Sequence, residues 1–328
     1  MEILAFGVQA DERPLLERAF DGHHQIRCLD VLLNRDTAPI AAGYEIITVG
    51  VDADLSAEVL QELAAGGTKM IAQRATGHRT IDLCAAADLG LTIGRVARSS
   101  PHSAAEFAWC LALAVDRRLV RGARRTRDAD LRLDGLMGRD LHGRTAGVLG
   151  TGRTGAAFAR IAHGFGMRLL GWDAVENPAC TELGMTYTGK EELLAESDLV
   201  SLHVPLVEST RHLIDAAALA AMKDDAVLVN TGRDGLVDTA ALVATLAAGR
   251  LRGVALDGVP DDTLARLMPF PNALLTADQA YFTEDAVGQV IDTTVRNIED
   301  YLAGRAGENL LVTPEGRLTP ERQPAAGR

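Results

Sequence analysis

The chain has 328 residues, of which 47% are hydrophobic and 24% are charged, and its net charge at pH 7 is -12. This length allows two domains of ordinary size, and the composition is typical of a globular protein with a sizeable core. The negative charge disfavours nucleic acid or an anionic membrane as a partner, because both require a basic face, and no apolar run approaches the length of a membrane span.

The cysteines and the first residues indicate the compartment. Cys28, Cys84, Cys110 and Cys180 are scattered without the spacing of metal ligands, so we predict no metal site. We interpret them as reduced thiols of a cytoplasmic protein. The opening segment, MEILAFGVQADERP, lacks a basic n-region and is typical of a first β-strand, so we expect no signal peptide.

Strand and helix patterns alternate along the chain. Strands are expected at residues 2–8, 44–49 and 69–73, with helices at 11–20 and 56–65. A second series of strands is expected at residues 145–149, 168–172, 199–203, 226–230, 252–256 and 273–276, followed by an amphipathic helix at 283–303. This alternation predicts an α/β fold in which helices cover both faces of parallel sheets.

A long helix is expected to begin at Pro101. Residues 104–115 are apolar all round, which predicts burial on every side. The helix then becomes basic, with arginines at positions 117, 118, 121, 124, 125 and 127. This run suits either phosphate binding or a solvated or subunit-facing helix end, and the acidity of the chain favours the second interpretation. The last 16 residues are polar and rich in Pro and Gly, which predicts a disordered tail.

A dinucleotide-binding motif follows the first strand of the second series. Gly150, Gly152 and Gly155 form a GxGxxG pattern between an apolar strand and a helix. In this pattern the first glycine permits a tight turn, the second lets the backbone approach the pyrophosphate, and the third lets the helix pack on the strand. Asp173 ends the next strand, where an acid meets a ribose hydroxyl and would repel a 2′-phosphate. We therefore predict NAD rather than NADP.

The chain resembles the D-2-hydroxyacid dehydrogenases over nearly its whole length. The segments that carry the resemblance are RATG, RTRDA, TAGVLGTGRTG, HGFGMRLL, SDLVSLHVPL, LVNTGRDGLVD, GVALD and LLTADQAYFTEDA. They are most similar to the D-lactate dehydrogenase branch, including the enzymes of vancomycin resistance. The resemblance implies a flavodoxin-like substrate domain of residues 1–100 plus 300–328, a Rossmann domain that binds NAD at 101–299, a cleft between them, and a homodimer formed through the cofactor domains.

The resemblance also implies a set of site residues. Arg233 would bind the carboxylate of a 2-oxo acid and polarise its carbonyl group, which suits the planar guanidinium. Asp257 would hold the nicotinamide carboxamide. The remaining cofactor residues would be Thr151, Arg153, Thr154, His203, Pro205, Thr231 and Gly232, beside the glycines and Asp173. The substrate residues would be Thr76, Gly77, His78, Arg79, Ser99 and Tyr281, of which Thr76 and Gly77 form a carboxylate-binding loop.

The chain departs from the family around the expected substrate position. Asp278 stands where the family has its acid/base histidine, and Asp262 stands where the family has a partner glutamate, with Asp261 as an alternative register. Asp234 follows Arg233 where the family has glycine. Ser99 replaces an aromatic pocket residue, and His78 and Arg79 are additional polar groups beside the carboxylate loop that would suit a second anionic group on the substrate.

These departures lead to our hypothesis for the acid/base. An unperturbed Asp has a pKa of about 3.9, so proton donation near pH 7 requires its pKa to rise by roughly 3 units, or about 4 kcal/mol. Two close carboxylates that share one proton would achieve this, and we assign the roles to Asp278 and Asp262. The alternatives are His78, Tyr281, or the loss of catalysis.

We therefore predict an NAD-dependent oxidoreductase that transfers a hydride between NADH and a small anionic 2-oxo or 2-hydroxy acid. The alternative is a protein that binds NAD(H) as a sensor or interaction module and has lost the dehydrogenase reaction.

Overall fold

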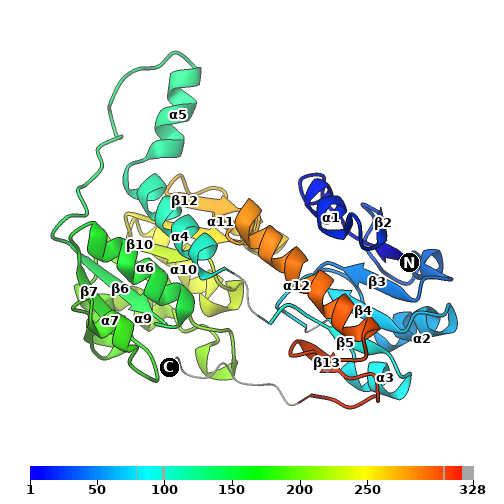
Figure 1. Ribbon diagram of the computed structural model, residues 1–328. Coiled ribbons are helices and arrows are strands. Elements are labelled where there is room, and N and C mark those ends of the chain that lie inside the picture. Colours follow the sequence, from blue (N-terminus) through cyan, green and yellow to red (C-terminus); the bar gives the residue numbers. More distant parts are fainter. Residues whose placement is uncertain (79, 98–99, 306, 320–328) are drawn as a thin grey trace. The chain divides into compact units, whose positions relative to one another are not determined.

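The computed structural model describes residues 1–78, 80–97, 100–305 and 307–319. The chain divides into two compact units. The first unit consists of the described residues of 1–100 and 283–319, and the second unit consists of Pro101–Phe282. Each unit contains one β-sheet with its own helices, which confirms the predicted α/β fold with two domains (Figure 1).

The first unit has a six-stranded sheet in the order β13-β5-β4-β3-β1-β2. The strands are β1 (Glu2–Ala5), β2 (Gln25–Cys28), β3 (Ile46–Val49), β4 (Met70–Gln73), β5 (Thr92–Gly94) and β13 (Leu310–Val312). The helices are α1 (Arg13–Phe20), η1 (Ala38–Ala41), α2 (Ala57–Ala65), α3 (Leu83–Asp88) and α12 (Glu284–Leu302). The first five strands are parallel in flavodoxin-like order, as predicted, whereas β13 pairs antiparallel with β5.

The second unit has a seven-stranded parallel sheet in the order β12-β11-β10-β9-β6-β7-β8. The strands are β6 (Thr145–Leu149), β7 (Arg168–Trp172), β8 (Thr186–Tyr187), β9 (Leu199–Leu202), β10 (Val227–Asn230), β11 (Gly253–Asp257) and β12 (Ala273–Thr276). The helices are α4 (Pro101–Asp116), α5 (Leu119–Arg127), α6 (Arg153–Gly164), α7 (Pro178–Thr181), α8 (Lys190–Glu196), η2 (Glu208–Thr210), α9 (Ala216–Ala221), η3 (Asp234–Leu236), α10 (Thr239–Ala247) and α11 (Asp261–Leu267). The strand order reverses between β6 and β9, as in Rossmann domains.

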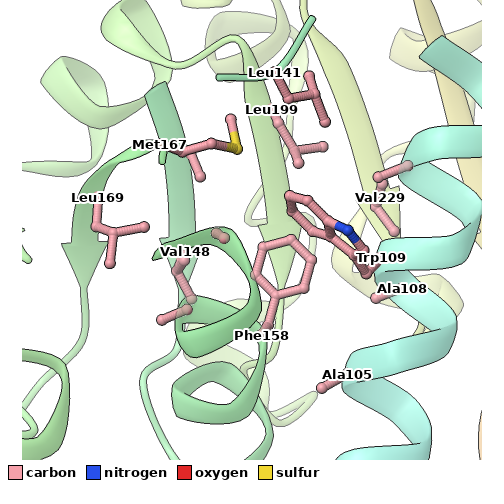
Figure 2. Packing of buried hydrophobic residues seen from close by; sticks show 14 of the residues in the cluster. Ala105, Ala108, Trp109, Leu141, Val148, Phe158, Met167, Leu169, Leu199 and Val229 are labelled. Carbon is pink, nitrogen blue, oxygen red and sulfur yellow. The ribbon is translucent and has the colours of Figure 1, made fainter. Parts of the chain in front are cut away.

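A buried cluster holds α4 and α6 against the second sheet. Figure 2 shows Trp109 of α4 packed against Phe158 of α6, and their rings meet edge to face with centroids 5.3 Å apart. Val148 of β6 and Val229 of β10 complete this layer. Burial explains the apolar sequence of α4, although Cys110 is exposed, so the prediction of burial on every side is wrong for that face.

The long basic helix of the prediction is broken in the structure. α4 ends at Asp116, Arg118 adopts a left-handed backbone conformation (φ 53°), and α5 begins after it. Asp116 is 1% exposed, and its carboxylate binds Arg139 (Nε–Oδ1 2.9 Å) and Arg252 (Nε–Oδ1 2.8 Å). These two ion pairs compensate for the burial of the Asp116 charge and fix the point where the helix ends.

Residues 117–138, which we call the arm, consist of α5 and a return segment. Figure 1 shows α5 reaching away from the sheet of its own unit, and α5 has no buried residue. Arg125 donates to the carbonyl oxygen of Asp134 (2.6 Å), and Arg121 lies over Gly135. Two arginines of α5 thus contact the arm's own return segment, which agrees with a solvated or subunit-facing helix end.

Two predicted boundaries differ from the structure. We predicted that residues 283–299 belong to the nucleotide domain. In the structure α12 packs against α1 and β4, so these residues belong to the first unit. The predicted disordered tail is wrong for residues 313–319, where Thr319 donates its backbone N–H to Leu311 (3.0 Å) and closes a turn on β13. The first error concerns a helix whose partners, α1 and β4, lie far away in the sequence.

No helix in the described residues is long and apolar enough to span a membrane.

Candidate functional site

The second sheet gathers the predicted site residues along one edge. In a parallel sheet all carboxyl ends lie on the same side, and ligands bind there, at the point where the strand order reverses. In the order of the strands from β7 to β12, the residues at or just after the carboxyl ends are Asp173, Gly150, His203, Arg233, Asp257 and Asp278. The order of the sheet therefore brings together residues that are up to 128 positions apart in the sequence.

The glycine loop between β6 and α6 has the geometry that was predicted from its sequence. Gly150 has φ of 91°, and a Cβ atom there would lie 2.6 Å from the backbone of His203. A Cβ atom on Gly155 would lie 1.9 Å from the Gly150 oxygen, so only glycine permits this packing of helix on strand. Gly152, by contrast, faces open space.

The start of α6 can hold a phosphate group. Gly152 is its N-cap and provides no side-chain cap, and Arg153 and Thr154 are the next two residues. The N–H groups of a first helical turn lack partners within the helix and attract anions, so uncapped donors beside open space fit a pyrophosphate. This observation shows that the residues present are suited to a dinucleotide.

Asp173 is attached to the same loop. Its Oδ2 atom accepts hydrogen bonds from the backbone N–H (2.6 Å) and the hydroxyl (3.2 Å) of Thr151, and its Oδ1 atom accepts from the N–H of Ala174 (2.7 Å). The acid predicted to meet a ribose is thus fixed in orientation by the residue between the first two glycines of the motif.

His203 follows β9 and is held in its neutral form. Its Nε2 atom lies 2.9 Å from the Ser201 hydroxyl, and its ring packs against Phe158 with centroids 5.1 Å apart. Desolvation lowers the pKa of His203 to about 4. Pro205 lies two residues further on, and its carbonyl accepts from the Thr210 hydroxyl (2.6 Å). His203 is therefore uncharged at neutral pH.

Arg233 is exposed on a loop that Asn230 organises. Asn230 is buried at the end of β10. Its side chain accepts from the N–H of Gly232 (2.9 Å) and donates to the carbonyl of Arg233 (2.8 Å), so it holds the backbone that follows Thr231. The Arg233 guanidinium donates to the Gly232 carbonyl (2.9 Å). Within the described residues no carboxylate forms an ion pair with it, which leaves its charge to attract an anion. Sequence reasoning missed Asn230, although an Asn before a turn often bonds to the backbone two residues on.

Asp257 organises the loop that carries Asp278. It is 4% exposed, and its carboxylate accepts from the Thr276 hydroxyl (2.5 Å) and from the backbone N–H groups of Gln279 (2.9 Å) and Ala280 (2.8 Å). Asp278 is exposed, has φ of 57°, and lies against Gly258, where a Cβ atom would come within 3.0 Å of it. Asp257 thus has a structural role in addition to the predicted role at the nicotinamide.

Asp262 has a carboxylate neighbour that the sequence did not reveal. Asp262 lies in the first turn of α11, and Asp234 begins η3 directly after Arg233. Desolvation and the charge of Asp262 raise the pKa of Asp234, and His212 opposes this shift. The acidic substitution beside Arg233 therefore interacts by charge with the acid predicted as the partner of Asp278.

The predicted substrate loop lies at the carboxyl end of β4 in the first unit. Arg95 donates from its Nη1 atom to the carbonyl of Thr76 (3.2 Å) and lies 2.9 Å from the Nδ1 atom of His78. Because a guanidinium only donates, Nδ1 must accept and the proton of a neutral His78 is on Nε2. Gly77 lies beside Val51. Sequence reasoning missed Arg95.

The other predicted substrate residues lie elsewhere. Tyr281 belongs to the second unit, is 43% exposed and packs edge to face on Phe282. Arg79 and Ser99 lie outside the described residues. Among the described residues no group of His, Cys, Asp and Glu could hold a metal ion.

Comparison with known proteins identifies the family. Residues 109–283 match the family model described as "D-isomer specific 2-hydroxyacid dehydrogenase, NAD binding domain". The chain belongs to this family. The match covers the glycine loop, Arg233 and Asp278, and because the matched domain is the family's NAD binding domain, it confirms the predicted cofactor and an oxidoreductase that acts on CH–OH donors.

Whole-chain relatives place this D-2-hydroxyacid dehydrogenase near D-lactate dehydrogenases. It is 40% identical to D-lactate dehydrogenase kk1H of Curvularia clavata over 91% of this chain and 90% of that protein. The apo-structure of D-lactate dehydrogenase from Escherichia coli superimposes with a TM-score of 0.92 at 36% identity, over 95% of this chain and 100% of that one. D-Lactate dehydrogenase from Aquifex aeolicus, complexed with NAD and lactic acid, gives a TM-score of 0.78 at 28% identity, over 92% of this chain and 96% of that one.

Proposed function

We propose that this D-2-hydroxyacid dehydrogenase reduces a small anionic 2-oxo acid with NADH, and that Asp278 serves as its acid/base. The observation that carries this proposal is the arrangement of Arg233, Asp257 and Asp278 at the carboxyl ends of three adjacent strands, beside the uncapped start of α6. The cation, the fixed carboxylate and the exposed acid lie along the edge where the dinucleotide motif also lies.

Arg233 would bind the substrate. Its guanidinium can grip the carboxylate and the carbonyl oxygen together and stabilise the negative charge that develops on that oxygen. Asn230 keeps the backbone of this loop in place through its bonds to Gly232 and Arg233. When bound, the dinucleotide supplies the hydride that the carbonyl carbon receives.

Asp278 would deliver the proton to the carbonyl oxygen in the reduction and remove it in the oxidation. The three hydrogen bonds that Asp257 accepts hold residues 276–280, so Asp278 stays at the end of β12 in its left-handed conformation. We retain Asp262 as its proposed partner, and Asp234 is a second carboxylate that interacts with Asp262. Close carboxylates favour a state in which one of them stays protonated.

The role of Arg233 can be tested with a panel of 2-oxo acids. Arg233→Ala should lower kcat/KM by about a hundredfold or more, because the transition state loses a charged donor, whereas Arg233→Lys should restore part of the loss. The affinity for NADH, measured by fluorescence titration, should not change in either variant. Turnover of 2-oxo acids by Arg233→Ala at the wild-type rate would contradict the assignment, and NADH binding without turnover of any 2-oxo acid would favour the sensor alternative.

The role of Asp278 can be tested through the pH dependence of reduction. The wild-type rate should fall as the pH rises through one apparent pKa, because reduction needs a protonated carboxyl group. Asp278→Asn should lose about a hundredfold or more in kcat, and Asp278→His should restore turnover with the falling limb near pH 6.5, the ordinary pKa of histidine. A wild-type pH profile in Asp278→Asn would refute the assignment. Asp262→Asn compared with its neighbour Asp261→Asn decides between the two registers of the partner.

We further propose that the arm joins two copies of the chain. Its return segment exposes Leu131 (76%), Leu133 (80%) and Met137 (86%), and exposed apolar side chains gathered on one projecting segment are typical of an interaction surface. A second copy is the simplest partner for a symmetric enzyme. The four unpaired cysteines agree with a reducing compartment, and we propose the cytoplasm.

A further inference from the structure

The residue between the first two glycines of the loop is held at every polar atom. Thr151 is 1% exposed, and its N–H and hydroxyl both bond to Asp173. Its carbonyl accepts from the side-chain amide of Asn177 (2.6 Å), and its hydroxyl accepts from the hydroxyl of Tyr187 (2.8 Å). The phenol oxygen of Tyr187 in turn accepts from the backbone N–H of Asn177 (2.8 Å).

These bonds form one directed chain. The N–H of Asn177 donates to Tyr187, the Tyr187 hydroxyl donates to Thr151, and the Thr151 hydroxyl donates to the carboxylate of Asp173. Each hydroxyl therefore uses its single proton toward the carboxylate, and the chain ends on the only group that is a pure acceptor. Neighbouring bonds of this kind reinforce one another.

The ends of the chain are themselves fixed. Asn177 is the N-cap of α7, where its Oδ1 atom accepts from the N–H of Ala179 (3.0 Å). Tyr187 lies on β8 opposite Gly171 of β7, and a Cβ atom on Gly171 would lie 3.1 Å from the Tyr187 ring. Glycine at this position lets the ring lie close to the strand whose end carries Asp173.

We propose that Asn177 and Tyr187 are positioning residues that set the choice of NAD over NADP. The chain ties Oδ2 of Asp173 to the glycine loop, and Oδ1, which accepts from the N–H of Ala174, has a further lone pair that can accept from the ribose diol. A carboxylate fixed in this way cannot turn aside for a 2′-phosphate, so the charge repulsion is retained. The inference rests on the proposed place of Asp173 at the ribose.

The test is direct binding of NADH and NADPH to the full-length enzyme, without substrate. Tyr187→Phe keeps the ring against Gly171 and removes only the hydroxyl, and Thr151→Val removes the next hydroxyl while Thr151→Ser keeps it. We expect Tyr187→Phe and Thr151→Val to bind NADH about threefold to tenfold more weakly, which corresponds to the loss of one hydrogen bond, and to discriminate less against NADPH. Thr151→Ser should behave as the wild type. Tyr44→Phe is the matched control, since it removes a phenol that bonds to Arg27 in the first unit.

The outcomes distinguish the positioning role of Asn177 and Tyr187 from the place of Asp173 at the ribose. A lower melting temperature in Tyr187→Phe with an unchanged ratio of NADH to NADPH affinity would overturn the proposal, because a merely structural role predicts that result. Equal affinity of the wild type for NADH and NADPH would instead overturn the place of Asp173 at the ribose. A reduced ratio in Tyr187→Phe and Thr151→Val, with a wild-type ratio in Thr151→Ser and Tyr44→Phe, is the result we expect.

Discussion

The substitution of aspartate for glycine at position 234 changes the electrostatics beside Arg233. Asp234 is partly buried, and both its desolvation and the charge of Asp262 oppose its ionisation, which raises its pKa. A carboxylate beside Arg233, the proposed substrate-binding cation, would also compete with the substrate for that cation. The acid is therefore expected to cost stability at neutral pH and to have been retained for its effect on the site.

The cost can be measured by urea unfolding of Asp234→Asn. The unfolded chain ionises Asp234 near its ordinary pKa and the folded chain ionises it only at higher pH, so the penalty is absent in acid and grows as the pH rises between these two values. We expect Asp234→Asn to be more stable than the wild type at pH 7.5, with a smaller difference at pH 4. In an Asp262→Asn background the difference should shrink. An equal difference at both pH values would show that the Asp234 charge is not disfavoured by folding.

Among individual residues, the sequence predicted those that can be located by their offset from a strand. The glycines, Asp173 and Arg233 are recognisable because they lie at fixed offsets from a strand, and the structure places them at one sheet edge. Asn177 and Tyr187 could not be found in this way, because they reach Thr151 across 26 and 36 positions through tertiary packing. Asp234 was recognised as a departure from the family. Its interaction with Asp262 could not be predicted, because the position of Asp262 depends on where α11 begins.

The arm shows how an element can be stabilised without a core of its own. Arg125 donates to the backbone carbonyls of Arg132 and Asp134 in the return segment, so the helix and the segment support each other while their apolar side chains stay exposed. Polar contacts of this kind order a projecting segment and leave its apolar surface to a partner.

A triple variant tests the arm as a dimer contact. Replacement of Leu131, Leu133 and Met137 by glutamate should convert the dimer to a monomer in sedimentation velocity, because like charges would meet across a symmetric interface. Val31→Glu with Leu32→Glu, which changes exposed apolar residues of the first unit, should leave the dimer intact. A wild-type protein that sediments as a monomer, or a triple variant that still sediments as a dimer, would contradict the proposal.

Among the elements, those with a strong apolar period were predicted to within a few residues. The missed strands are short or depend on distant pairing: β2 alternates exposed and half-buried residues, β5 has three residues, β8 has two, and β13 forms only by pairing antiparallel with β5. The break between α4 and α5 was missed because nothing in the local sequence indicates that Asp116 is buried against Arg139 and Arg252.

For the whole molecule, the main consequence of the topology is that the first unit is completed by the last helix. Ile298 of α12 is fully buried in this unit. Ile298→Ala should cost about 2 to 5 kcal/mol and weaken the first unit selectively. Both tryptophans, Trp109 and Trp172, lie in the second unit, so their fluorescence should report an unchanged urea transition while circular dichroism shows an earlier one.

Control measurements accompany this prediction. The affinity of Ile298→Ala for NADH should equal that of the wild type, because the glycine loop lies in the second unit. Leu228→Ala, which removes a fully buried side chain of β10, should instead move the tryptophan transition. Fluorescence and circular dichroism transitions that move together in Ile298→Ala would mean that the two units unfold as one.

The arm begins after Asp116 and ends before Arg139, and these two residues are bound to each other. The chain thus leaves the nucleotide domain and returns to it at one place, between two residues that are 23 positions apart in the sequence. Insertions, deletions or exchange of the arm between relatives would alter its reach and its partner without displacing the strand ends that hold the dinucleotide. The proposed assembly contact and the chemistry can therefore evolve separately in this protein, since the arm joins the nucleotide domain at one place, where Asp116, Arg118 and Met137 bond to Arg139 or Arg252.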